Sequence, residues 1–300
     1  MVTNKNKIMK KMFNKITYLL SISILFISIT SCEKDNSTET PLEKTEFKDV
    51  VYGEHQQQKY DIYLPKDRNT TSTKVFILIH GGGWIEGDKK DMNALATELQ
   101  KSYPDYAVVN INYRLASIGN SPFPMQIDDI KSIIAALKQK KEEYQISNQY
   151  ALIGTSAGAH LSMLYAYAHD SNNEIDLVAS IVGPTNFTDD AYVHSTKPGF
   201  KYIFALIQQI TGVNFQNNND FFINVSPYHV VTASAPPTIL FYGGLDNLVP
   251  ESQGKDMHTK LDQLSVTNEF TLYANEGHGW EGENLFDTIT KLRAFINTNF

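Results

Sequence analysis

The chain has 300 residues, of which 42% are hydrophobic and 20% charged, and a formal net charge of −7. These values are typical of a globular protein with a substantial core, and the negative charge argues against nucleic acid as the main partner. A single cysteine, Cys32, excludes an intrachain disulfide and a cysteine-based metal cluster.

The first 31 residues differ from the rest of the chain. Lysines between positions 5 and 15 precede an apolar run over residues 16–29, which is short for a membrane span. Residues 1–31 are therefore predicted to be a signal peptide. With Ser31 and Cys32 the pattern resembles a bacterial lipoprotein signal, which makes Cys32 the lipidated first residue; an ordinary secretory signal is the alternative. Residues 32–46 are interpreted as a polar tether, so we expect an exported protein, anchored through Cys32 to a bacterial membrane such as the outer membrane or cell surface.

From Phe47 onward, stretches with strand character alternate with stretches of helical spacing. Strands are expected at residues 58–64, 75–79, 107–112, 150–153, 176–182, 238–242 and 269–273. Helices are expected at 88–102, from Pro124 onward, and at 159–169, 252–264 and 285–296. This alternation predicts an α/β fold with a mostly parallel central sheet and helices on both faces.

The alternation lapses over residues 184–237, which are rich in Asn, Pro and aromatic residues and have one helical stretch around 202–210. We interpret this segment as a small cap insertion above the sheet that shapes a cleft. The predicted catalytic domain is then residues 47–300, with the cap inside it.

Residues 154–158 read Gly-Thr-Ser-Ala-Gly between an expected strand and an expected helix. The glycines allow a tight turn that exposes the Ser156 hydroxyl at a helix N-terminus, where backbone N–H groups favour developing negative charge. A helix N-cap is the alternative role for this serine. The remaining motifs favour a nucleophile.

An activated serine needs a base and a group that orients the base. Asp246 follows the strand expected at 238–242, and His278 follows the strand expected at 269–273. Both therefore fall at the carboxyl ends of strands, where a parallel sheet gathers its functional loops. We predict that Ser156, Asp246 and His278 form a catalytic triad. Each of the last two residues alone could be an ordinary loop residue.

The segment His80-Gly81-Gly82-Gly83-Trp84 follows another expected strand. Its glycines let backbone N–H groups approach a substrate carbonyl, so Gly82 and Gly83, with Ala157, are predicted to form the oxyanion hole. A phosphate cradle is disfavoured because no helix begins with a Gly-Lys-Ser/Thr arrangement here. Histidine spacing predicts no metal site, and no cofactor is expected.

These motifs occur in order with Asn112-Tyr113-Arg114-Leu115, Phe123-Pro124-Met125-Gln126 and Gly183-Pro184-Thr185-Asn186-Phe187. Together they resemble an α/β-hydrolase of the bacterial esterase branch related to hormone-sensitive lipase, most similar to the feruloyl/acetyl xylan esterases. The resemblance implies a serine carboxylic-ester hydrolase that acts through an acyl-enzyme and removes acetyl or feruloyl-type groups from plant-type glycans. A short-chain lipase or general carboxylesterase, a peptidase, and a catalytically silent glycan-binding homologue remain as alternatives.

Three aromatic residues are candidates for contacting a small-molecule or oligosaccharide ester: Trp84, Trp280 and Phe187. Their flat faces suit a sugar or an aromatic acyl group. Packing within the core or the cap is the alternative for each.

Overall fold

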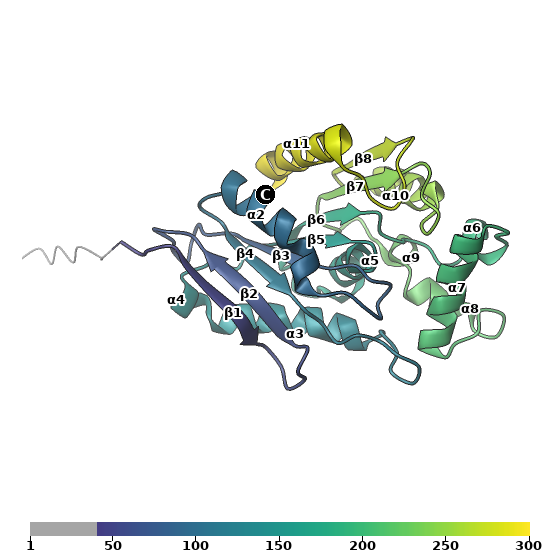
Figure 1. Cartoon of the computed structure of the whole chain (residues 1–300), viewed down its shortest axis with the longest axis horizontal. Helices are drawn as coiled ribbons and strands as arrows, with labels where there is room; N and C mark the ends of the chain where they lie inside the picture. Colours follow the sequence, from purple (N-terminus) through teal and green to yellow (C-terminus); the bar gives the residue numbers. More distant parts are fainter. Residues whose placement is uncertain (1–40) are drawn as a thin grey trace, which may run out of the picture. The chain divides into compact units, whose positions relative to one another are not determined.

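The computed structural model describes residues 41–300, and one eight-stranded sheet runs through them (Figure 1). The predicted signal peptide, Cys32 and most of the predicted tether lie outside the described residues. The strands are β1 (Thr45–Val51), β2 (Lys59–Leu64), β3 (Val75–Ile79), β4 (Ala107–Ile111), β5 (Tyr150–Thr155), β6 (Ile175–Ile181), β7 (Thr238–Gly243) and β8 (Asn268–Tyr273). Their order across the sheet is β1-β2-β4-β3-β5-β6-β7-β8.

The prediction of a mostly parallel sheet is confirmed. β1 pairs antiparallel with β2, and β2 pairs antiparallel with β4. All pairings from β4 to β8 are parallel. Because parallel strands share one direction, the loops that follow β3, β5, β7 and β8 emerge at the same edge of the sheet.

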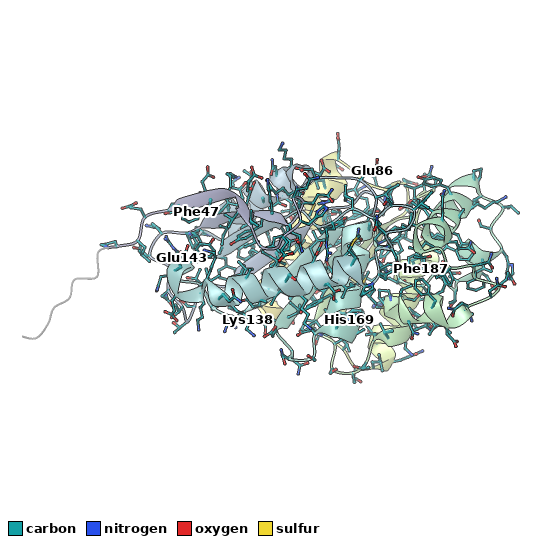
Figure 2. The ribbon with its side chains drawn as sticks, turned by 90° about the horizontal axis from the view of Figure 1, so that it is seen from below. Phe47, Glu86, Lys138, Glu143, His169 and Phe187 are labelled. Carbon is teal, nitrogen blue, oxygen red and sulfur yellow. The ribbon has the colours of Figure 1, made fainter. Side chains whose placement is uncertain are left out.

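Helices cover both faces of the sheet, as the sequence predicts. The alternation of side chains along β3 shows why: Val75, Ile77 and Ile79 belong to one hydrophobic cluster, whereas Phe76 and Leu78 belong to the other. The first cluster includes residues of α3, α5 and α10, and the second includes residues of α2 and α11. Figure 2, seen from below, shows α3 lying across the first of these faces.

Most of the expected helices are present with small changes in their ends. They are α2 (Asn93–Ser102), α3 (Met125–Gln139), α5 (Ala157–Leu164), α10 (Glu251–Gln263) and α11 (Gly282–Asn299). A short helix that was not expected, α4 (Lys141–Tyr144), follows α3. The helix expected at 88–102 begins with a separate 3-10 turn, η1 (Lys89–Met92), which Asp88 caps. The one expected at 159–169 starts earlier, as α5, and ends in a π turn, η2 (Tyr165–His169).

Strand β1 was not expected from the sequence, and it begins two residues before the predicted start of the domain at Phe47. Lys89, buried next to β1, makes ion pairs of 2.9 Å with Asp49 of β1 and 2.8 Å with Asp61 of β2. These contacts tie the first two strands to the segment that follows the glycine-rich loop.

Between β6 and β7 the chain forms helices α6 (Asp190–Val193), α7 (Pro198–Thr211), α8 (Asn219–Asn224) and α9 (Pro227–Val230). α6, α7 and α8 lie at the end of the molecule opposite β1, on the right in Figure 1. The expected helical stretch at 202–210 is part of α7. Among residues 41–300, no helix combines the length and the apolar character that crossing a membrane requires.

Candidate functional site

Ser156, His278 and Asp246 form a continuous hydrogen-bonded chain at the carboxyl edge of the sheet. His278 Nε2 lies 2.9 Å from Ser156 Oγ, and His278 Nδ1 lies 2.6 Å from Asp246 Oδ2. The three residues follow β5, β8 and β7, respectively. The structure therefore brings together the residues that the strand-end argument selected.

The backbone at Ser156 has the tight turn that the flanking glycines indicate. Ser156 has φ 51° and ψ −119°, a strained conformation for a residue with a side chain, and α5 begins at the next residue. A Cβ added at Gly158 would lie 2.1 Å from the Ile79 carbonyl oxygen, so only glycine fits there. The Ser156 side chain makes no capping hydrogen bond. It points instead to His278, which argues against the N-cap alternative.

Asp246 is held by hydrogen bonds on both carboxylate oxygens. Its Oδ1 accepts the backbone N–H groups of Leu248 at 2.7 Å and Val249 at 3.0 Å, which leaves Oδ2 for His278. The Asp246 side chain is 1% exposed, whereas that of His278 is 24% exposed. A buried, fixed carboxylate orients the imidazole so that Nδ1 carries its proton and Nε2 faces the serine.

The glycine-rich loop packs directly against the serine. A Cβ added at Gly81 would lie 3.2 Å from Ser156 Cβ. Gly82 and Gly83 have φ values of 105° and 54°, which turn the backbone in a way that favours glycine. Within residues 41–300, no hydrogen bond uses the backbone N–H of Gly82, Gly83 or Ala157. This is the arrangement expected of oxyanion donors awaiting an acceptor.

His80 braces the glycine-rich loop. Its ring stacks on Tyr113 with the ring centroids 4.2 Å apart, and the Tyr113 hydroxyl donates a hydrogen bond of 2.8 Å to the His80 carbonyl. Burial lowers the pKa of His80, so the ring is neutral at physiological pH. Tyr113 belongs to the Asn112–Leu115 motif, whose contact with the loop gives it a structural role.

Trp84 and His160 connect this loop to the nucleophile helix and to the cap. Trp84 Nε1 donates to His160 Nδ1 at 3.3 Å, and His160 Nε2 donates to the Val225 carbonyl at 2.8 Å. Burial lowers the pKa of His160 to about 4, which keeps this neutral tautomer. The sequence places His160 in the helix after Ser156, but its two specific hydrogen bonds cannot be deduced from that position.

A cavity of about 1070 Å³ contains Ser156 and His278. It is lined by the glycine-rich loop, α2, the end of β6, the cap helix α7, the Asp246 loop and α11. Trp280 also lines the cavity, and its Nε1–H donates a hydrogen bond of 2.8 Å to Thr288 Oγ1. Trp84 also lines it but is only 1% exposed, so its ring serves mainly as wall.

The expectation that Phe187 contacts substrate is corrected by the structure. Phe187 has 0% exposed surface and does not line the cavity. Its ring packs between Trp84, His160 and Tyr192, near the cap helices (Figure 2). It therefore supports the cavity wall.

Several cavity residues were not singled out from the sequence: Leu95, Tyr202, Leu206, Phe286 and Arg293. They lie on α2, α7 and α11, where helical spacing had suggested only packing faces. The sequence signal that could have identified them is a large apolar residue just outside the buried stripe of a helix, as with Tyr202 and Phe286. Residues 41–300 contain no group of three His, Cys, Asp or Glu residues placed to hold a metal ion.

The family model described as BD-FAE matches residues 60–261. The esterase LipC of Mycobacterium tuberculosis (strain ATCC 25618 / H37Rv) is 25% identical over 264 residues, which cover 83% of this chain and 64% of LipC. The chain spans about half to two thirds of the length of several curated relatives that it matches.

Solved structures share the fold. A bifunctional GH43-CE protein of Bacteroides eggerthii matches with a TM-score of 0.69 and 24% identity over 83% of this chain and 38% of that chain. A truncated carbohydrate esterase from gut microbiota matches with a TM-score of 0.66 and 22% identity, over 83% of this chain and 96% of that chain. The expected α/β-hydrolase fold is thereby confirmed.

Proposed function

The chain belongs to the BD-FAE family of α/β-hydrolases, and we propose from this premise that it is a serine carboxylic-ester hydrolase. The observation that carries the proposal is the hydrogen-bonded chain from Ser156 through His278 to Asp246 inside an open cavity. The curated relatives, which include proteins named esterase and carboxylic ester hydrolase, support the same activity.

The first half of the reaction forms an acyl-enzyme. Ser156 Oγ attacks the ester carbonyl carbon while its proton passes to His278 Nε2, and the electron pair of the carbonyl moves to oxygen. The N–H groups of Gly82, Gly83 and Ala157 stabilise that oxyanion. His278 then donates its proton to the departing alcohol oxygen as the bond to carbon breaks. Asp246 stabilises the imidazolium throughout.

The second half reverses these roles with water. His278 takes a proton from a water molecule as the water oxygen attacks the acyl carbon, and a second oxyanion forms at the same donors. Its collapse expels Ser156 Oγ, which regains a proton from His278. The products are a carboxylic acid and the free enzyme.

We also propose that the ester is an acetyl or feruloyl-type group on a plant-type glycan. A cavity of about 1070 Å³ has room for far more than an acetyl group, and Trp280 and Tyr202 place aromatic rings on its wall. Two of the solved structures that share the fold are a carbohydrate esterase and a bifunctional GH43-CE protein.

The test uses purified protein and a fluorophosphonate probe, followed by hydrolysis of 4-nitrophenyl acetate and of acetylated and feruloylated xylo-oligosaccharides. We expect labelling of the wild type, no labelling of Ser156→Ala, and normal labelling of Ser132→Ala, which changes a serine on α3. Hydrolysis of the simple ester without any glycan ester would reject the glycan assignment. Failure to label the folded wild type, or hydrolysis of peptide anilides alone, would reject esterase activity.

We further propose that the protein is exported and lipid-anchored at Cys32. The support is the sequence of residues 1–32: lysines, an apolar run and a small residue before the cysteine. Metabolic labelling with a fatty acid should mark the wild type and not Cys32→Ser. Equal labelling of the two, or none in the wild type, would contradict the anchor.

A further inference from the structure

The catalytic cavity extends between α2 and α11 as an open groove. Each helix lines the groove with one face, because the lining residues are spaced i, i+4, i+7 on α2 and i, i+4, i+8 on α11. These residues, which define the α2–α11 groove, are Ala94, Glu98 and Lys101 on α2 and Leu285, Ile289 and Arg293 on α11. The side chain of Phe286 lies on the rim and is 75% exposed.

The groove starts at the catalytic residues and runs away from them. α2 follows the glycine-rich loop and η1, and α11 follows the loop that carries His278, so both helices begin at the catalytic edge of the sheet. The span from Leu285 to Arg293 along α11 corresponds to about 12 Å at the rise of an α-helix. At the far end the Tyr103 hydroxyl, just after α2, donates 3.1 Å to the Arg293 carbonyl and ties the two helices together.

The groove changes character along its length. Its near half is mostly apolar, with Ala94 lining it from α2, Leu285 and Ile289 lining it from α11, and Phe286 on the rim. Its far half carries Glu98, Lys101 and Arg293. Within the described part of the chain, none of the side chains of these three residues makes an ion pair. Glu98 Oε1 accepts a hydrogen bond of 3.0 Å from the Ser102 hydroxyl. The cationic ends of Lys101 and Arg293 are therefore the groups that can donate to hydroxyl groups of a ligand.

Resting on the proposed function, we propose that the α2–α11 groove binds the alcohol side of the substrate, as a glycan chain longer than a single sugar ring. The alcohol side is favoured because its leaving oxygen must receive a proton from His278, and the α11 wall follows His278 directly in the chain. Sugar rings pack their C–H faces on apolar and aromatic groups, as the near half offers.

A fatty acyl chain fits this groove less well. It would bring hydrocarbon against Glu98, Lys101 and Arg293, and burying such groups without hydrogen bonds is costly. The exposed rim at Phe286 would also leave one side of the chain in water. A glycan keeps hydroxyl groups on both its far end and its outer side.

The experiment compares kcat/KM for acetylated xylose, acetylated xylotriose, 4-nitrophenyl acetate and 4-nitrophenyl octanoate. We expect the trisaccharide ester to exceed the monosaccharide ester by about tenfold or more, because remote contacts contribute binding energy to the transition state. Ile289→Trp, which narrows the groove, should lower the ratio of trisaccharide to 4-nitrophenyl acetate by about tenfold. The matched control is Ala294→Trp, an exposed position of α11 outside the cavity lining, which should keep both values.

A second variant, Lys101→Met with Arg293→Met, removes the cations at exposed positions where misfolding is not expected. It should lower the same ratio and raise KM for the trisaccharide ester more than it lowers kcat. Circular dichroism checks the fold of all variants.

Equal kcat/KM for the mono- and trisaccharide esters would overturn the groove assignment while ester hydrolysis stands. Selective loss of octanoate hydrolysis in Ile289→Trp would also overturn it, in favour of an alkyl chain. If the wild type hydrolyses 4-nitrophenyl acetate but neither sugar ester, the glycan assignment under the proposed function itself falls. These outcomes separate the two proposals.

Discussion

His160→Phe is expected to destabilise the fold in a pH-dependent way. The substitution keeps an aromatic ring in the cluster around Trp84 but removes both hydrogen bonds of the imidazole. The Trp84 N–H and the Val225 carbonyl would then be buried without partners. Leaving a buried polar group unpaired costs about 1–3 kcal/mol, so we expect a loss of about 2–6 kcal/mol at pH 8.

The difference between the two proteins should shrink as the pH falls. In the folded wild type, burial lowers the pKa of His160 from 6.5 to about 4, so between these values the unfolded chain binds the proton more readily. The wild type therefore loses stability as the pH falls from 6.5 toward 4, by about 3 kcal/mol in total. Phenylalanine does not titrate, so the His160→Phe variant does not lose this stability as the pH falls. The stability that His160 adds is present in full above pH 6.5 and declines below it.

Urea unfolding followed by circular dichroism at pH 8 and near pH 4 measures both quantities. All other titrating groups are shared by the two proteins and cancel in the difference. His194→Phe changes an exposed histidine after α6 and should shift stability by less than about 0.5 kcal/mol at both pH values. A wild-type advantage over His160→Phe that stays constant with pH would refute the reasoning.

Other substitutions probe the remaining features of the site. Asp246→Asn offers His278 an amide N–H in place of a carboxylate and so favours the wrong imidazole tautomer. The kcat for 4-nitrophenyl acetate should therefore fall by about 10⁴ with the fold retained. A loss below tenfold would contradict the role assigned to Asp246. Gly158→Ala places a methyl group 2.1 Å from a carbonyl oxygen of β3 and should abolish folding or sharply lower the melting temperature, whereas Gly277→Ala, which meets nothing within 4 Å, serves as its control. Lys89→Met leaves the carboxylates of β1 and β2 without their buried cation and should lower the free energy of unfolding by about 3–5 kcal/mol in urea titrations, and a change under 1 kcal/mol would show that water replaces it.

The triad and the parallel part of the sheet could be predicted because both depend on local rules. Buried strands read as continuous apolar runs, and a parallel sheet collects its strand-end loops at one edge. Ser156 and Asp246 each follow such a run, and His278 follows the partly exposed edge strand β8. Their meeting at one edge of the sheet therefore required no knowledge of side-chain packing.

Features that depend on long-range packing could not be predicted. β1 reads Thr-Glu-Phe-Lys-Asp-Val-Val, with little apolar alternation, because it lies at the sheet edge with most of its side chains exposed. Whether Phe187 faces the cleft or the core depends on Trp84 and His160, which are distant in sequence. Leu285 shares a helical stripe with the buried Leu292 and yet is 44% exposed, because the first turn of α11 overhangs the cavity.

The placement of the reactive groups after four different strands has a consequence for how the chain acquires activity. β3 carries the glycine-rich loop, β5 the serine, β7 the aspartate and β8 the histidine. β3 pairs with β5 and β7 pairs with β8, and β6 joins the two pairs. Contacts between residues so distant in sequence form late, because each requires the closure of a long loop of chain. A collapsed refolding intermediate with its helices formed would thus be inert, and recovery of turnover would follow the completion of the sheet. The regain of hydrolytic activity during refolding would then report the formation of the complete native sheet. A spectroscopic signal from the helices would not distinguish that step.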